Sequence, residues 1–463
     1  MPSPAQLPDE PVAPAAPALS LYRKLAIGIG DFGFNFYWQI ASLYLLYFYT
    51  DVLKLPPAAA GAIYMAALIW DAVLDPVVGL FVDKTRSRFG RYRIYLVLGS
   101  LPLAASFIFM LMPPTYPAVG AVVLTLVSHI AFRTFYAITS VPYAALSARV
   151  TRDAGDRADI TAARMVSAAL SAVLVASVTI PFISWLEASS GRRSAWIIIA
   201  AVYAVLATAI VQFSAYAARG LDASSEHDAA GPTLPEKLRA TRANWPLLLV
   251  LLAVGVTSFV NTIFQKNILY YFKYVVGDAK LGSLALGLWA LVTVLCVPLW
   301  TMVARRWGKR IAWLSGIGPY LLGTVLWRLA DGHGTAALFG ALACMSGGLA
   351  AYYVSFWAML PDTVEYGEWK TGVRSESFAF GLLVFGQKAA LGLGAGGLGL
   401  MLSRVGYVAD GVQGPEVLGA IKAAMLWMPL AGGLIAAALI AYYPISPGRH
   451  RAMVDEIAAR GAP

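Results

Sequence analysis

The residues best suited to chemistry are two aspartates inside the apolar run 70–76, WDAVLDP. Asp71 and Asp75 are four positions apart, so a helix carries both carboxyls on one face. Their mutual repulsion and their burial both disfavour the doubly ionised state. Such a pair can take up and release a proton near neutral pH, or it can share a cation. The alternative is a structural ion pair with Arg164 or Lys388.

A third acid lies near the start of another apolar run. Asp31 is followed by Asn35 and Trp38. A carboxylate beside amide and aromatic groups suits a polyhydroxylated ligand, because it accepts hydrogen bonds from hydroxyls while a ring stacks on the apolar face of a sugar. The alternative is a helix-packing site in which Asp31 pairs with a cation. Arg164 and Lys388, in two later runs, supply positive charge, because isolated acids inside a membrane are costly.

Three further ionisable residues lie inside apolar runs. Arg133 and Lys266 either join this polar cluster or extend outward to the membrane surface. His129 has the chemistry of a proton relay, although a histidine packed in the protein core is the commoner case.

The composition indicates which elements hold these residues. Of 463 residues, 59% are hydrophobic and 13% are charged, against roughly 45–50% and about 25% in soluble proteins. The excess lies in runs of about 20 residues, which is the length of a membrane-crossing helix. Strands of a membrane barrel are about half as long. We therefore expect an all-α, multi-pass protein of the cell (inner) membrane, with the lipid bilayer as its surroundings.

The net charge of +10 is explained by basic loops on one side of the membrane, and no nucleic-acid motif accompanies it. Cys296 and Cys344 lie in apolar stretches and predict no disulfide framework.

Twelve runs are long enough to cross a bilayer. Most Lys and Arg fall in the segments that are cytoplasmic if both termini are cytoplasmic, as the positive-inside rule requires. The predicted spans are 25–50, 58–82, 92–112, 117–147, 161–185, 194–217, 246–272, 281–304, 311–330, 335–360, 377–403 and 416–443.

A polar connection divides these spans into two blocks of six, an arrangement typical of major facilitator transporters. It is expected to hold a short helix near 236–242. The predicted parts are a disordered tail 1–20, an N-terminal six-helix bundle 21–218, a central cytoplasmic loop 219–244, a C-terminal six-helix bundle 245–443 and a cytoplasmic tail 444–463.

Two glycine patterns imitate a dinucleotide fingerprint, at 28–33 and at 394–399. Neither follows a strand, so they are better explained by close helix packing. The chain has no nucleophile elbow, zinc-protease motif or P-loop. It is predicted to be a non-enzyme without cofactor or structural metal.

Several motifs in order resemble the glycoside–pentoside–hexuronide:cation symporter family of the major facilitator superfamily. The resemblance covers nearly all of residues 21–443. The matching segments are 30–32 (GDF), 49–52 (YTDV), 71–76 (DAVLDP), 83–93 (DKTRSRFGRYR), 141–146 (VPYAAL) and 361–368 (PDTVEYGE), followed by Lys388.

This resemblance implies cation-coupled sugar uptake by alternating access. It assigns the cation to Asp71 and Asp75, and it places Tyr136 and Tyr353 where the family has aromatic sugar contacts. The other residues expected around the sugar and cation are Asp31, Ser140, Arg164 and Lys388.

Two departures from the family pattern bear on the ion. Leu74 replaces an asparagine beside the second acid of the pair, and Ser140 replaces an acid before Pro142. Because Na⁺ needs several oxygen ligands and a proton needs one basic carboxylate, H⁺ is favoured. Na⁺ at Asp71 and Asp75 stays open, since Thr139 and Ser140 offer oxygens.

The basic loop 84–93 and the acidic stretch 362–368 are both predicted to be cytoplasmic, which suggests an inner gate between the halves. The alternative is a solvated basic loop. The gate residues expected are Asp83, Arg91, Asp362 and Glu365.

The sequence therefore predicts a secondary active transporter that carries a sugar or glycoside together with H⁺ or Na⁺. Two alternatives stay open: transport of a lysolipid or another amphipathic compound on the same fold, and a receptor or assembly factor without turnover. A monomer suffices for this scheme, and no pattern fixes the oligomeric state.

Overall fold

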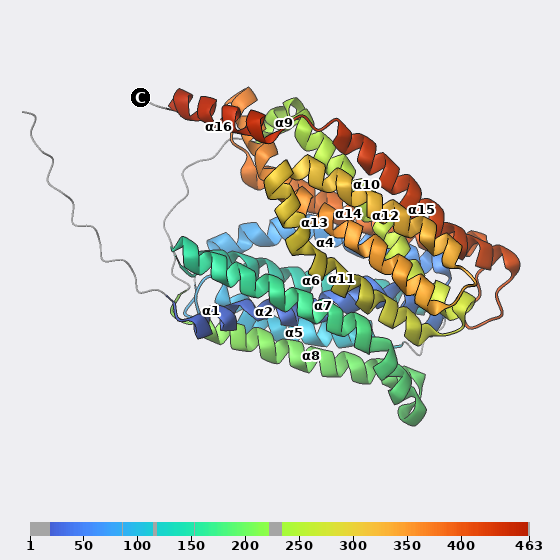
Figure 1. Ribbon diagram of the computed structural model, residues 1–463. Helices are drawn as coiled ribbons and strands as arrows, with labels where there is room; N and C mark the ends of the chain where they lie inside the picture. The colour runs from blue at the N-terminus through green and yellow to red at the C-terminus, as the bar shows by residue number, and fades with distance from the viewer. Residues whose placement is uncertain (1–18, 86, 114–117, 152, 222–233, 462–463) are drawn as a thin grey trace, which may run out of the picture.

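The computed structural model describes residues 19–461 except 86, 114–117, 152 and 222–233. Nearly all of the predicted tail 1–20 and half of the central loop lie outside this range. The described part is helical and contains no strand (Figure 1). Its long helices are α4 (Pro57–Lys84), α5 (Arg93–Met110), α6 (Ala118–Arg149), α7 (Ala154–Ser190), α8 (Arg192–Ala217), α10 (Trp245–Tyr271), α11 (Ala279–Trp307), α12 (Lys309–Ala330), α13 (Thr335–Thr371), α14 (Glu376–Arg404) and α15 (Pro415–Ala441).

The first apolar run is divided into shorter pieces. The elements are α1 (Leu21–Gly28), α2 (Gly30–Gln39), the π-helix η1 (Ile40–Tyr44), α3 (Leu45–Tyr47) and the π-helix η2 (Phe48–Val52). A third π-helix, η3 (Phe272–Val276), follows α10. Because a π-turn interrupts the regular hydrogen-bond ladder, such segments often lie at functional sites. Here they carry Ser42, Asp51 and Lys273.

Two bundles lie side by side in Figure 1. The elements from α1 to α8 form one and those from α10 to α15 form the other. The expected short helix between them is present as α9 (Leu234–Ala243), and α16 (Pro447–Gly461) follows the second bundle. The start of α1 and the helix α16 lie at the same end of the molecule. We call this the terminal end and the opposite end the distal end.

Ten of the described helices are long and apolar enough to span a membrane. Two predicted spans are not among them. The span 25–50 is divided into short elements, and the span 311–330 lies in α12, which carries Lys309, Arg310 and Arg328. Twelve spans and cytoplasmic termini therefore stay predictions. In lipid, every backbone polar group must be paired within the protein, so helices are the expected spanning element. Large apolar side chains such as Phe81 and Val205, each 67% exposed, cover the outer helix faces.

Small residues bring the two bundles together where α4 packs on α14. A Cβ on Gly399 would lie only 2.3 Å from the Pro57 carbonyl oxygen, and one on Gly61 would lie 3.0 Å from the Ala395 oxygen. Likewise, a Cβ on Gly28 would lie 2.5 Å from that of Ala163. The packing interpretation of both glycine patterns is confirmed.

Candidate functional site

The acid pair joins the two bundles at the contact of α4 with α14. The Asp71 side chain is fully buried, and the Lys388 ammonium lies 2.9 Å from its Oδ2. The same ammonium donates to Asp75 Oδ2. Arg133 of α6 brings its Nη1 to 3.6 Å from Asp71 Oδ2. Both acids are thus held by a cation of the opposite half, which is one of the two arrangements that the sequence left open.

Asp31 forms a separate ion pair. Arg164 Nε donates to Asp31 Oδ2 at 2.6 Å, and Nη1 of the same guanidinium donates to Ser147 Oγ at 2.5 Å. The Arg164 guanidinium also lies 5.0 Å from the ring centroid of Tyr143. The acids Asp31, Asp71 and Asp75 are therefore held in two separate groups, and both members of the Asp31–Arg164 pair belong to the N-terminal half.

A cavity of about 390 Å³ lies between the bundles, within the size range of small-molecule sites. Its lining is rich in amide and aromatic side chains. The lining residues include Trp38, Gln39, Ser42, Tyr64, Asn261, Thr262, Gln265, Lys266, Trp289, Tyr353 and Gln387.

Of the six predicted substrate residues, Tyr353 lines this cavity. Asp31, Ser140 and Arg164 are not among its lining residues. Lys388 is not either, because a helix turns by about 100° per residue, so Gln387 faces the cavity while Lys388 faces α4.

Tyr136 lies one layer behind the cavity wall. Its ring centroid is 6.0 Å from that of Trp38, which lines the cavity, and 5.9 Å from that of Phe132. In this conformation Tyr136 positions the indole of Trp38.

The other interior cations face inward and do not extend to the membrane surface. Lys266 is 3% exposed, donates to the Ser42 carbonyl, and lies 4.0 Å from the Tyr64 ring centroid. Arg133 Nε donates to His129 Nε2 at 3.3 Å. His129 accepts this hydrogen bond and packs as a core residue between Tyr49 and Tyr64.

Sequence reasoning missed most of the polar cavity wall. Asn261 and Gln265 are four residues apart on α10, and Gln39 and Gln387 face them from α2 and α14. The available signal was an amide inside an apolar run. Such residues carry no charge and therefore stand out less than the acids and bases.

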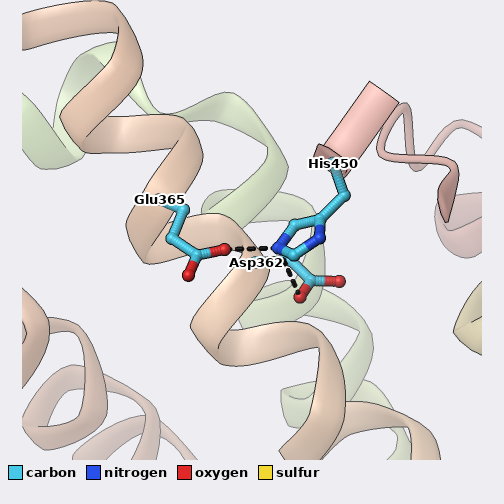
Figure 2. Close-up of side chains that lie close together, drawn as sticks. All are labelled: Asp362, Glu365 and His450. Atoms are coloured by element: carbon cyan, nitrogen blue, oxygen red, sulfur yellow. Dashed lines mark hydrogen bonds and ion pairs between the residues drawn. The ribbon is translucent and has the colours of Figure 1, made fainter. Parts of the chain in front are cut away.

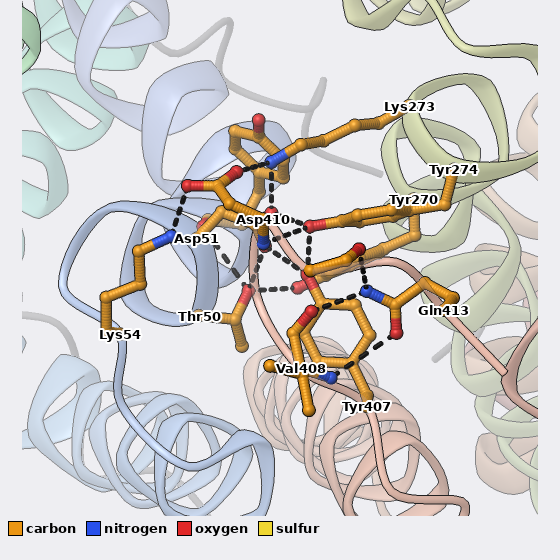
Figure 3. A network of polar contacts seen from close by, with 12 residues as sticks. Thr50, Asp51, Lys54, Tyr270, Lys273, Tyr274, Tyr407, Val408, Asp410 and Gln413 are labelled. Carbon is orange, nitrogen blue, oxygen red and sulfur yellow. Dashed lines mark hydrogen bonds and ion pairs between the residues drawn. The ribbon is translucent and has the colours of Figure 1, made fainter.

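The distal end is closed by a network of ion pairs that also was not predicted (Figure 3). We call it the distal network, and its members are Asp51, Lys54, Arg192, Lys273 and Asp410. Lys273 Nζ lies 2.5 Å from Asp51 Oδ1 and 2.5 Å from Asp410 Oδ1. Arg192 Nη1 is 2.5 Å from Asp410 Oδ2, and Lys54 also pairs with Asp410.

Hydroxyl groups complete the closure around the buried Asp51. Tyr407 donates to Asp51 Oδ2 at 2.6 Å and Tyr274 to Oδ1 at 2.5 Å. Thr50 and Tyr270 exchange a hydrogen bond at 2.7 Å across the same interface. The side chain of Asp51 is 0% exposed, so this carboxylate is shielded from solvent.

The charge of the distal network should be insensitive to mild acid. Partial burial raises the pKa of Asp410, but hydrogen bonds from Lys273, Lys54 and Arg192 hold it well below its usual range. A carboxyl with a depressed pKa contributes stability above its ordinary pKa of about 3.9, and this is lost only as pH falls through the lower folded value. In the absence of sugar, we therefore expect no change between pH 7.5 and 5 in the distance across the distal end, measured between spin labels at Ala188 and Val412. A widening within that window would contradict this assignment.

The two acids of the predicted inner gate, Asp362 and Glu365, have their described partners within the C-terminal part of the chain, and the gate itself stays a prediction. Asp362 accepts from Lys309 at 2.6 Å and lies 3.4 Å from His450 Nε2, which also bonds Glu365 (Figure 2). All four belong to the C-terminal part of the chain, so these contacts attach α16 to α13. Among the described residues, the buried Arg91 Nε has no hydrogen-bond partner, and the Asp83 side chain lies outside the described part.

Asp362, Glu365 and His450 are residue types that can bind a metal ion, and their side-chain ligand atoms lie within 4.8 Å of one another. Because the Lys309 ammonium already occupies the Asp362 oxygen, we interpret them as an ion-pair site.

Two helical bundles around a central cavity, joined by charged side chains at mid-depth, define a polytopic transporter with the major facilitator fold. The sequence profile of the MFS/sugar transport protein family matches residues 26–447. The chain belongs to this family, the glycoside–pentoside–hexuronide symporter branch of the superfamily. It is thus a multi-pass membrane transporter and not an enzyme, as predicted.

Relatives support this assignment along nearly the whole chain. The isoprimeverose transporter of Lactiplantibacillus pentosus is 29% identical over 432 residues, covering 91% of this chain and 88% of the relative. The glucuronide carrier protein homolog of Escherichia coli is 29% identical over 445 residues, covering 95% and 96%. The inward-open xylose transporter XylE of Escherichia coli superposes with a TM-score of 0.65 at 13% identity, covering 95% and 100%. At that identity, the structural likeness supports the fold alone.

Proposed function

We propose that the protein is a secondary active transporter of the cell (inner) membrane that carries a sugar or glycoside together with a cation, H⁺ in preference to Na⁺, by alternating access. The observation that carries this proposal is the cross-half bridge in which one ammonium, that of Lys388, holds both Asp71 and Asp75. A titratable acid pair at the contact of the moving halves can link ion binding to reorientation.

Protonation is the event that this bridge can sense. A proton on Asp75 removes its charge and therefore its attraction for Lys388. Asp71 keeps both Lys388 and Arg133 as partners, so one contact between α4 and α14 is weakened while the deeper one is retained. Once the sugar is also bound, the fully loaded carrier then reorients more easily than the form that holds sugar without the ion.

The same geometry supports H⁺ over Na⁺. The ammonium of Lys388 occupies the space between the two carboxylates in which a metal ion would bind, and Leu74 offers no oxygen beside Asp75. A proton needs a single carboxylate oxygen, whereas hard cations require several oxygen ligands.

The cavity chemistry supports a polyhydroxylated substrate. Gln39, Asn261 and Gln265 offer donors and acceptors to hydroxyls, and Trp38 and Trp289 offer faces for an apolar sugar surface. The relatives named for isoprimeverose and for a glucuronide are in agreement. A lysolipid carrier would need a larger apolar lining than this one.

Alternating access requires the distal network to open in the opposite state. Removing one member of a buried ion pair costs about 3–5 kcal/mol. Because the pair exists in the distally closed state only, its loss destabilises that state and not the open one. We therefore expect Asp51→Asn to shift the population strongly toward a distally open form. The measurement is the distance between spin labels at Ala188 and Val412, after replacement of Cys296 and Cys344.

Asp331→Asn is the matched control, because this acid pairs with Lys422 within the C-terminal half. Its label distances should be those of the parent protein. An unchanged distribution in Asp51→Asn would show that the distal network is not a gate.

The proposed function is tested by counterflow into liposomes that contain the purified protein and an unlabelled sugar. Labelled mono- and disaccharides, glycosides and hexuronates are added outside in turn. Transient accumulation of at least one of them is the expected result. If correctly folded protein exchanges none, and instead exchanges a lysolipid, the substrate class proposed here is wrong.

A further inference from the structure

The buried charges around the central cavity do not balance. Two acids, Asp71 and Asp75, lie near three cations, Lys388, Arg133 and Lys266. Lys388 and Arg133 each lie within 4 Å of a carboxylate oxygen. Lys266 is buried, with only 3% of its surface exposed, yet it forms no ion pair with any residue in the described ranges. One positive charge facing the cavity is therefore left without a protein counter-charge.

The groups that do contact Lys266 are neutral. Its ammonium donates to the Ser42 carbonyl in η1 and lies over the face of the Tyr64 ring. An ammonium has three N–H donors, so this carbonyl uses only one of them. An uncompensated cation at this depth is costly, and charges that persist inside membrane proteins usually mark substrate or ion pathways.

Lys266 also shares a surface with the groups suited to a sugar ring. Asn261, Thr262 and Gln265 line the same cavity from the same helix, α10. The Asn261 Oδ1 is buried and has no hydrogen-bond donor in the described structure, so it is free to accept from a hydroxyl. The cavity therefore has one cationic corner beside a wall that binds hydroxyl groups.

From this arrangement we infer that the substrate is an acidic sugar, and that Lys266 binds its carboxylate or sulfonate. The inference rests on the proposed sugar transport and adds the charge of the substrate. An ammonium acts as a point charge and accepts either anion, so the shared feature is the negative charge next to a polyhydroxylated ring.

This assignment also balances the transport cycle. A proton on Asp75 adds one positive charge, and an anionic sugar at Lys266 adds one negative charge. With one proton per sugar, the empty and the fully loaded carrier then have the same net charge. Each half-loaded form differs from them by one charge, so the two forms that must reorient are electrically matched.

The test compares probes that share a sugar ring and carry either an anionic or an uncharged group at C6. Methyl glucuronide, its methyl ester and the corresponding 6-sulfonate, with their galacto isomers, compete for counterflow of the labelled sugar identified above. The wild-type protein should bind the acid and the sulfonate at least about tenfold more tightly than the uncharged ester.

Substitutions at Lys266 test whether this residue causes the preference for the acid over the ester. Losing a hydrogen-bonded charge partner typically costs 2–5 kcal/mol, so Lys266→Met should weaken the acid at least about 30-fold and leave the ester nearly unchanged. Lys266→Arg should retain the preference for the acid. The matched control is Lys422→Met, which removes a lysine that pairs with Asp331 away from the cavity.

Three outcomes overturn the inference. They are equal competition by acid and ester in the wild-type protein, transport of neutral sugars only, and a preference for the acid that persists in Lys266→Met. The first two outcomes are measured on the wild-type protein, so they can contradict the inference even if Lys266→Met does not fold. Absence of transport for every sugar, charged or neutral, contradicts the proposed function itself.

Discussion

Asp75→Asn is expected to abolish gradient-driven accumulation while leaving sugar exchange intact. An inward proton gradient of two pH units supports at most about a 100-fold concentration ratio for one proton per sugar, since each tenfold ratio requires about 1.4 kcal/mol. The wild-type protein should accumulate its sugar well above tenfold in liposomes. In Asp75→Asn the ratio should fall to about one, because the amide cannot carry the coupling proton.

Counterflow is the readout that separates lost coupling from lost transport. It needs no net ion movement, so Asp75→Asn should still exchange labelled for unlabelled sugar. Asp75→Glu, which keeps a carboxyl, should retain part of the accumulation. If Asp75→Asn still accumulates sugar from a pH gradient, the coupling site lies elsewhere.

The second large effect is expected for Lys388→Met. This change removes the only described ion-pair partner of Asp75 and leaves Asp71 with Arg133. Removing one partner of a buried ion pair costs about 3–5 kcal/mol, so the variant should unfold at a clearly lower temperature in detergent. It should also be uncoupled, because an unpaired buried acid takes up a proton and keeps it.

The double variant Asp75→Asn/Lys388→Met tests the origin of that loss. With Asp75 neutral, less unpaired charge is buried, and thermal stability should recover in large part. Lys422→Met, which breaks a partly exposed pair, should cost less than about 1 kcal/mol. A double variant no more stable than Lys388→Met alone would show that the lysine stabilises the fold by other contacts.

Charged residues inside apolar runs could be recognised from the sequence, whereas the pairings between helices could not. The helices could be predicted because lipid allows few alternatives, and the acids Asp71 and Asp75 could be singled out because a charge inside an apolar run is costly. Their partner Lys388 was named among the alternatives. The pairing of Arg164 with Asp31 alone could not be assigned, because it depends on which helices are neighbours.

The cavity wall and the distal network escaped prediction for two further reasons. Asn261 and Gln265 are uncharged, and nothing in a single helix shows which face meets the other half. Asp51 and Asp410 are 359 positions apart in connections between predicted spans, where charged residues are ordinary. Only the π-turn η2 and the packing of the halves bury Asp51 against Lys273.

The central claim is that sugar and ion move together, and a sugar-dependent ion flux tests it most directly. The transported sugar is added to a weakly buffered suspension of liposomes with no imposed gradient while the external pH is recorded. Alkalinisation of the medium that requires both the sugar and Asp75 is the predicted result. A sugar-dependent Na⁺ flux without alkalinisation would reassign the coupling ion, and sugar entry with neither flux would contradict symport.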